Sequence, residues 1–225
     1  EGEKVIMIWQ SPSVETTSLN PGAALTFHAS LQARLAGEPD LPENVAAERA
    51  ARQALVEAAW NGPGRLETPD RDLDTAYALQ KFHVLECPIE THRGVITHNG
   101  SLTYSPGIWA NDPVEYSSPL FPLFGDSALN QAAMNMYRVW LAHCREHGAD
   151  PFPGSFEHAA LKLTQKGRGD DAMVLYGLSK FLLFQGDRSA AGEMWPLIIF
   201  SAESVLQNTR ADGVVASPTD EMEGR

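Results

Sequence analysis

Acidic and aromatic side chains gather between Tyr104 and Tyr116, and they form the stretch of this sequence best suited to chemistry. Asp112 and Glu115 are three residues apart, so one helical turn would put both carboxylates on one side. Trp109 lies beside them in the sequence. Aromatic rings stack on the apolar face of a sugar ring, and carboxylates bind its hydroxyls or move protons. These residue types therefore predict a carbohydrate site.

The same residues have a purely structural interpretation, which the spacing leaves open. Asp112 precedes Pro113, a residue favoured in the first turn of a helix, and Glu115 follows at the distance of a capping box. In that case Asp112 caps a helix that begins at Pro113. Both interpretations place the carboxylates in or beside a helical turn.

A second acidic cluster closes the sequence. Asp220, Glu221 and Glu223 lie within four residues and are followed by Arg225. Side chains alternate along an extended backbone, so Glu221 and Glu223 would point the same way there. Such a set could bind sugar hydroxyls or hold a water molecule. The alternative is a solvated acidic turn, with Thr219 or Asp220 as a helix cap.

The histidines give a weaker signal. His143 and His147 stand in an H-x-x-E-H pattern, the order of an inverted zincin motif. They fall in the last turn before Gly148, where histidines favour the negative end of the helix dipole, and the sequence offers no third ligand. We therefore predict no metal site. Of the histidines that flank the long connection, His98 is the best placed to serve as a site residue, although the pattern favours an ordinary loop or helix position for it.

Composition narrows the function classes. The chain has 225 residues, with 17 Lys and Arg against 29 Asp and Glu, for a formal net charge of -12. Nucleic-acid binding and a polybasic membrane anchor both need clustered cations, so neither partner is expected. No apolar run approaches the ~20 residues of a membrane span. Cys87 and Cys144 are too few for a disulfide framework and are expected as buried free thiols.

The elements that would position these groups are mostly helices. A strand is predicted at 5–9, a turn at 20–22 and a second extended piece at 24–28. From residue 43 the pattern becomes helical, with Val45, Leu55, Val56 and Trp60 as candidate buried positions of the first helix. Helices are predicted over 43–60, 68–87, 128–147, 170–185 and 189–207, with a long irregular connection over 88–126.

Three helix signals are specific enough to test. Thr68 is the predicted cap of the second helix, and Asp170 or Asp171 the predicted cap of the fourth. The fourth helix is apolar nearly all round, which predicts burial on most sides. Pro196 is expected to kink the fifth helix or to split off its first turn.

These motifs together resemble the six-hairpin glycosidases, enzymes built on an (α/α)6 toroid of helical hairpins. The resemblance rests on the string YSPGIWAND at 104–112, followed by Glu115, Tyr116 and Pro119. The closing strings GVVAS at 213–217 and DEMEGR at 220–225 are similar to a second loop of bacterial glycan-degrading members. The helix start GDDAM at 169–173 also fits, so the resemblance covers about 68–225.

The resemblance implies a glycoside hydrolase, usually inverting, with one carboxylate as acid and another as base. By position it assigns Asp112 and Glu115 to acid catalysis or substrate binding, and Glu221 and Glu223 to the other carboxylate. The residues that would contact the sugar are Tyr104, Trp109, Asn111, Tyr116, Asp220, Arg225 and His98. It implies a carbohydrate substrate and no cofactor.

The same resemblance gives the expected fold class. We predict a mainly α chain in two parts, a β segment with its linker at 1–42 and a helical portion at 43–225. The first would be the end of a β-sandwich, and the second about half of a toroid, with the chain ending inside it.

Two alternatives stay open. The same fold carries polysaccharide lyases and glycoside phosphorylases. Tyr104 and His98 are compatible with a lyase, whereas Arg168 alone is too little for the anion site of a phosphorylase. The other alternative is a non-catalytic helical protein that binds a glycan or a partner.

Overall fold

The computed structural model describes residues 5–10, 18, 20–24, 30–37, 39, 44–91, 93–98, 107–148, 152–156 and 169–216. The chain folds as two compact units, Glu1–Ala54 and Leu55–Arg225. The division into a β segment at 1–42 and a helical portion at 43–225 stays a prediction.

The first unit contains an antiparallel strand pair. Strand β1 (Val5–Gln10) pairs with β2 (Ser30–Leu35) in a register that sets Val5 opposite Leu35 and Gln10 opposite Ser30. The predicted strand at 5–9 is therefore confirmed. The turn at 20–22 is confirmed as well, since the amide of Ala23 donates to the carbonyl of Asn20 at 2.9 Å. Residues 25–28 of the predicted second piece lie outside the described residues.

Helix α1 (Val45–Asn61) confirms the first predicted helix but not its buried positions. Val45, Val56 and Trp60 are 39%, 38% and 37% exposed, and Leu55 is half-buried. Ala59 is the buried residue of this helix. The expectation was wrong because the position of α1 that is buried holds a small alanine, whereas the larger side chains lie wholly or partly at the surface.

Helix α2 (Arg71–Leu85) begins later than expected because Asp70, not Thr68, is its cap. The Asp70 carboxylate accepts from the amides of Asp72 at 2.9 Å and Leu73 at 3.2 Å, which satisfies two free donors of the first turn. The Thr68 hydroxyl instead donates to the carbonyl of Asp70 at 2.9 Å.

The connection over 88–126 is more regular than predicted. It contains two short strands that form a hairpin, a third that pairs with a later strand, and two non-α helical segments. These elements are β3 (Ile89–Thr91), β4 (Gly94–Ile96), β5 (Ile108–Trp109), the π-helix η1 (Ala110–Ser117) and the 3-10 helix η2 (Ser118–Phe124), and β5 pairs with β6 (Ser155–Phe156).

The helix of this connection starts earlier than the capping alternative required. The π-helix η1 begins at Ala110, and Trp109 occupies the cap position without a side-chain cap. Asp112 therefore lies inside the first turn rather than before it, and its own amide donates to the side chain of Asn111 at 2.9 Å. A helix beginning at Pro113 with Asp112 as its cap is wrong.

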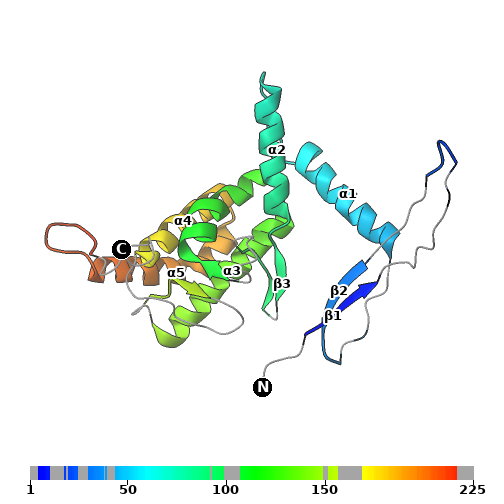
Figure 1. Ribbon diagram of the computed structural model, residues 1–225. Helices are drawn as coiled ribbons and strands as arrows, with labels where there is room; N and C mark the ends of the chain where they lie inside the picture. The colour runs from blue at the N-terminus through cyan, green and yellow to red at the C-terminus, as the bar shows by residue number, and fades with distance from the viewer. Residues whose placement is uncertain are drawn as a thin grey trace. The chain divides into compact units, whose positions relative to one another are not determined.

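Three long helices form the body of the second unit: α3 (Ser127–His147), α4 (Asp170–Gln185) and α5 (Arg188–Gln207) (Figure 1). All three confirm the predicted ranges to within a residue or two. Gly148 ends α3 as expected, and α5 continues through Pro196 without losing its first turn. The described chain is mainly helical.

The start of α4 differs from the prediction. Gly169 takes the cap position with a φ of 83°, in the left-handed region that favours glycine. Asp170 and Asp171 follow inside the first turn, where their charge favours the positive end of the helix dipole. Both are buried, and Asp171 accepts from the Ser204 hydroxyl of α5 at 2.7 Å.

The core of this unit is built on aromatic residues of α3 and α4. Trp140, Tyr137 and Phe181 are fully buried. Their polar atoms are satisfied: the Trp140 indole donates to the carbonyl of Pro153 at 2.9 Å, and the Tyr137 hydroxyl lies 2.6 Å from the hydroxyl of Ser118. These bonds fix η2 and the β6 region to α3.

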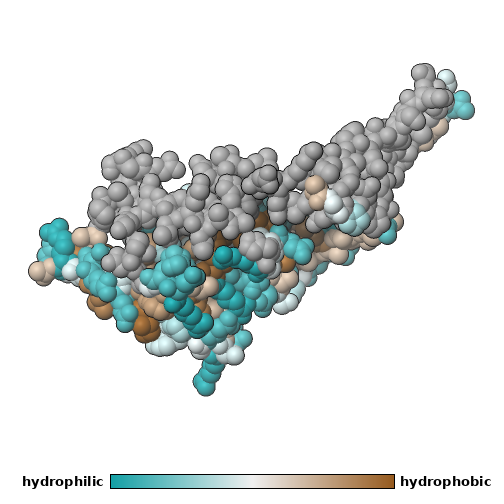
Figure 2. All heavy atoms as spheres, turned by 90° about the horizontal axis from the view of Figure 1, so that it is seen from below, coloured by the Kyte–Doolittle hydropathy of each residue, from teal (hydrophilic) through white to brown (hydrophobic). Residues whose placement is uncertain are grey.

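Apolar side chains also reach the surface of the helices. Leu183 is 75% exposed, Leu206 is 70% exposed and Trp195 is 59% exposed. The face seen in Figure 2 shows apolar surface in brown among polar surface in teal. None of the helices in the described part of the chain is both long and apolar enough to cross a bilayer.

Candidate functional site

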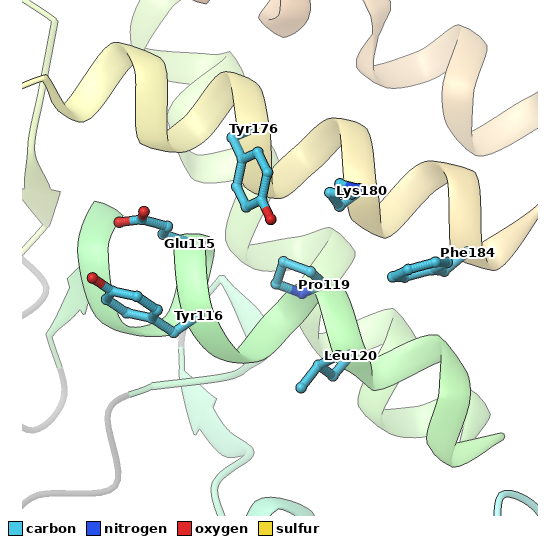
Figure 3. Close-up of a pocket in the computed structure, with 7 residues that line it drawn as sticks. All are labelled: Glu115, Tyr116, Pro119, Leu120, Tyr176, Lys180 and Phe184. Carbon is cyan, nitrogen blue, oxygen red and sulfur yellow. The ribbon is translucent and has the colours of Figure 1, made fainter.

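A groove of about 430 Å³ runs between α4 and the two helical segments η1 and η2. Its lining is mostly aromatic and aliphatic, with one carboxylate and one ammonium group. Figure 3 shows the lining residues, which are Glu115, Tyr116, Pro119, Leu120, Tyr176, Lys180 and Phe184. An apolar groove with a few polar groups is the usual form of a small-molecule site.

One wall of the groove is a face of α4. Tyr176, Lys180 and Phe184 recur at four-residue spacing, which places them in a row along one side of an α-helix. Tyr176 is 52% exposed and Phe184 is 47% exposed. The opposite side of α4 carries the buried residues. The helix is therefore apolar nearly all round, as predicted, but it exposes this row of side chains at the surface.

The other wall comes from η1 and η2. Glu115 and Tyr116 lie on η1, and Pro119 and Leu120 lie on η2. These segments are held from behind by Ser118, whose hydroxyl lies 3.2 Å from the carbonyl of Val114 and 2.6 Å from the hydroxyl of Tyr137. The wall is therefore fixed to the core by hydrogen bonds that leave its outer face open.

A glycine sets how closely the two walls approach. A Cβ atom added at Gly177 of α4 would overlap the carbonyl oxygen of Val114, so only a residue without a side chain fits there. Gly177 follows Tyr176, a lining residue of the groove, directly in the sequence. Figure 3 shows the ring of Tyr176 projecting from α4 toward η1, where Glu115 and Tyr116 lie.

The two charged groups of the groove, one acidic and one basic, differ in how far they are exposed to solvent. Glu115 is half-buried, and one of its carboxylate oxygens is shielded from solvent. Lys180 is exposed, and its ammonium lies 5.8 Å from the centre of the Tyr176 ring, within the range of a cation–π contact. A carboxylate held beside aromatic rings can accept bonds from hydroxyl groups or exchange a proton with a bound molecule.

The structure places two of the predicted site residues in this groove, Glu115 and Tyr116. Asp112 is exposed on η1 and is not part of the lining. The two acids do not share the groove because η1 is a π-helix: its hydrogen bonds span five residues, so a step of three covers less of a turn than in an α-helix.

The other described candidates lie outside the lining. Trp109 and Asn111 are half-buried at the start of η1, and His98 is half-buried after β4. Burial lowers the pKa of His98 below its usual value, which favours the neutral imidazole. Tyr104, Asp220, Glu221, Glu223 and Arg225 lie outside the described residues.

Sequence reasoning missed the α4 wall. Tyr176, Lys180 and Phe184 fall in a helix whose residues are almost all apolar, a composition that predicts burial. The available signal was the row of an aromatic, a cation and an aromatic at four-residue spacing. Such a row would have indicated an exposed stripe on that helix.

A second pocket, of about 300 Å³, lies where α1 meets α2. Trp60 and Tyr77 contribute aromatic rings and Asp74 a carboxylate. That carboxylate is already engaged, since it accepts from the amide and the hydroxyl of Thr68, both at 2.9 Å. Because its acid has a structural role at the start of α2, this pocket is the weaker candidate site.

His143 and His147 lie side by side at the end of α3, with ring centres 4.6 Å apart. His143 is buried against the ring of Phe156, whereas His147 is at the surface. Within the described ranges, no three His, Cys, Asp or Glu side chains are grouped as metal ligands would be.

Comparison with models of protein families, with curated proteins and with solved structures finds no match.

Proposed function

We propose that this protein is a glycoside hydrolase and that the groove between α4 and η1–η2 binds the sugar. The observation that carries the proposal is the position of Glu115, a half-buried carboxylate in a groove lined by the rings of Tyr116, Tyr176 and Phe184. Aromatic rings offer flat surfaces for the C–H faces of a pyranose, and the carboxylate reaches the polar edge of the ring.

In this proposal Glu115 is one of the two carboxylates that glycoside hydrolysis needs. The second is Glu221 or Glu223, as the resemblance to the six-hairpin glycosidases implies. An inverting reaction requires the two carboxyls to stand ~6.5–9.5 Å apart, so that a water molecule fits between the base and the sugar. One acid protonates the leaving oxygen, while the other removes a proton from the attacking water.

The fold belongs to the same proposal. The helices α3, α4 and α5 would be part of an (α/α)6 toroid, and the β1–β2 pair would be the end of a β-sandwich. Toroid enzymes place their carboxylates on loops at one end of the helices. Glu115 lies on η1, in the connection that precedes α3.

A second function is favoured by the groove's composition. Glu115 is the single carboxylate among the described residues that line it. A groove with one acid and three aromatic rings is sufficient to bind a glycan without cleaving it. The second candidate is therefore a non-catalytic carbohydrate-binding protein.

A panel of aryl glycosides and oligosaccharides separates these candidates. The products are followed by proton NMR from the first minutes, and binding is measured in parallel by saturation-transfer NMR. Release of a sugar whose initial anomer is inverted supports the hydrolase. Binding without release supports the second candidate. Neither binding nor release across the panel contradicts both.

A further inference from the structure

We infer that the groove is selective for an acidic sugar, a uronic acid, whose carboxylate binds Lys180. The inference rests on the proposed function, because it takes the groove as a sugar site, and it adds the substrate class. It begins from the position of a cation in a groove that is otherwise apolar and acidic. Lys180 lies in the middle of the α4 row, between the rings of Tyr176 and Phe184 (Figure 3).

The ammonium group of Lys180 makes no ion pair with any carboxylate in the described ranges of the chain. Two other cations of the unit, by contrast, are held in ion pairs. Arg138 binds Glu193 through two nitrogens, at 2.6 and 2.8 Å, and Arg210 binds Asp212 at 2.8 Å. Lys180 is therefore available to an anion that enters the groove.

A neutral sugar should bind beside Lys180 less favourably than a sugar that carries a carboxylate. A ring stacked on Tyr176 would cover the neighbouring ammonium and remove water from it, and a hydroxyl replaces that water only in part. A carboxylate supplies a charge-assisted hydrogen bond instead, which is about twice as strong as a neutral one. The aromatic floor and the adjacent cation together fit a sugar that carries an anionic group beside its apolar face.

The two charged groups of the groove also orient the ligand. Glu115 lies on the η1 wall, and Lys180 lies on the α4 wall on the far side of Tyr176 (Figure 3). A uronate carboxylate is repelled by Glu115 and attracted by Lys180. The sugar is therefore held with its carboxylate toward Lys180 and its opposite edge, where a glycosidic oxygen can lie, toward Glu115.

The net charge of the whole chain also limits how many negative charges the ligand can carry. A formal net charge of -12 repels long polyanions, and this repulsion acts over a Debye length of ~10 Å at 0.1 M salt. A single carboxylate at Lys180 gains the local attraction with little of the long-range cost. The inferred substrate is thus a short glycoside with one uronic acid in the groove, rather than a polyuronate.

The test compares matched aryl glycosides that differ only at C6: a glucuronide, a glucoside and a glucose 6-sulfate derivative, with galacto counterparts. Wild-type protein should prefer the uronide over the neutral sugar by about 10- to 100-fold in kcat/KM, or in Kd if no cleavage occurs. Lys180→Met should remove this preference, so that the uronide and the neutral sugar are bound or cleaved to a similar extent. Arg188→Met, which removes an exposed cation at the start of α5, is the matched control and should keep the preference.

Each outcome has a separate meaning. Binding of neutral sugars with no preference for the uronide overturns the acidic-sugar inference and leaves the proposed function standing. If the wild-type protein binds none of these sugars, both the acidic-sugar inference and the proposed function are overturned. A preference for the sulfate over the carboxylate, or a uronide preference that survives Lys180→Met, contradicts the inference as stated. Circular dichroism of Lys180→Met confirms that its fold is intact, and Lys180→Arg, which keeps the charge, should retain part of the preference.

Discussion

Gly177 of α4 lies against the carbonyl oxygen of Val114 in η1, with no space for a Cβ atom between them. Among the described glycines, Gly177 is the one at which the two walls of the groove come into contact. It follows Tyr176 directly in the sequence. The width of the groove therefore depends on a residue that has no side chain.

Gly177→Ala should push α4 away from η1 and widen the groove. Forced overpacking of this kind costs about 1–3 kcal/mol in the free energy of unfolding, and sugar binding should weaken with it. Gly192→Ala on α5 is the matched control, because a Cβ there meets open space. The control should instead stabilise the protein by about 0.5–1 kcal/mol through helix propensity. Urea denaturation of both variants measures the difference, and equal effects would contradict the packing account.

Ser204→Ala should destabilise the junction of α4 and α5. The Ser204 hydroxyl donates to the buried carboxylate of Asp171 at 2.7 Å, and its removal leaves that oxygen short of a partner. A lost hydrogen bond to a charged group costs about 1.5–3 kcal/mol in the free energy of unfolding. Ser189→Ala, at an exposed position of α5, should change it by less than about 0.5 kcal/mol. Thermal and urea denaturation should rank the two variants in this order.

Stability should fall as the pH drops below about 6.5 because of His143. Burial lowers the pKa of His143, the neighbouring His147 lowers it further, and Glu146 opposes the shift. The unfolded chain therefore takes up its proton first, and stability is lost as pH falls from the unfolded pKa through the lower folded one. His143→Leu removes the titrating group and should flatten part of the slope of urea midpoints between pH 7 and 5. A slope unchanged by the substitution would show that other groups, such as His98, carry it.

The two cysteines should differ in reactivity. Burial raises the pKa of the Cys144 thiol to about 12, so almost none of it is thiolate at pH 8. Cys87 is half-buried after α2, and burial together with Glu86 raises its pKa as well. A disulfide reagent should modify Cys87 slowly and Cys144 only after denaturation. Modification of both thiols in the native protein at the denatured rate would disagree with the burial of Cys144.

Local sequence patterns were enough to predict the long helices but not their surroundings. The helices α3, α4 and α5 follow from apolar periodicity and from glycines such as Gly148 that end them. The range of α4 is as predicted, but its cap is not: aspartate is a good cap in general, whereas here Gly169 takes the cap position in the left-handed region and both aspartates are buried in the first turn. A local sequence pattern does not show that Ser204, which is distant in the sequence, donates a hydrogen bond to Asp171.

Only the η1 wall of the groove could be predicted from the sequence. Glu115 and Tyr116 were recognised because acid and aromatic residues lie together in the sequence. Tyr176 and Lys180 were missed because they approach that segment only through tertiary contact, which depends on the absence of a side chain at Gly177. The π-helical turn also lacked a local signal, and it separates Asp112 from the groove that Glu115 lines.

The central claim is that Glu115 is a catalytic carboxylate in this groove, and the substitution Glu115→Gln tests it most directly. The amide keeps the shape of the side chain but can neither donate nor accept the proton that hydrolysis moves. The matched control is Glu203→Gln, at an exposed position of α5. The measurement is kcat/KM for the best glycoside of the panel, with urea midpoints to confirm intact folds. We predict a loss of at least about 100-fold for Glu115→Gln and a change of less than about two-fold for Glu203→Gln; equal, undiminished activity in both variants would contradict the account.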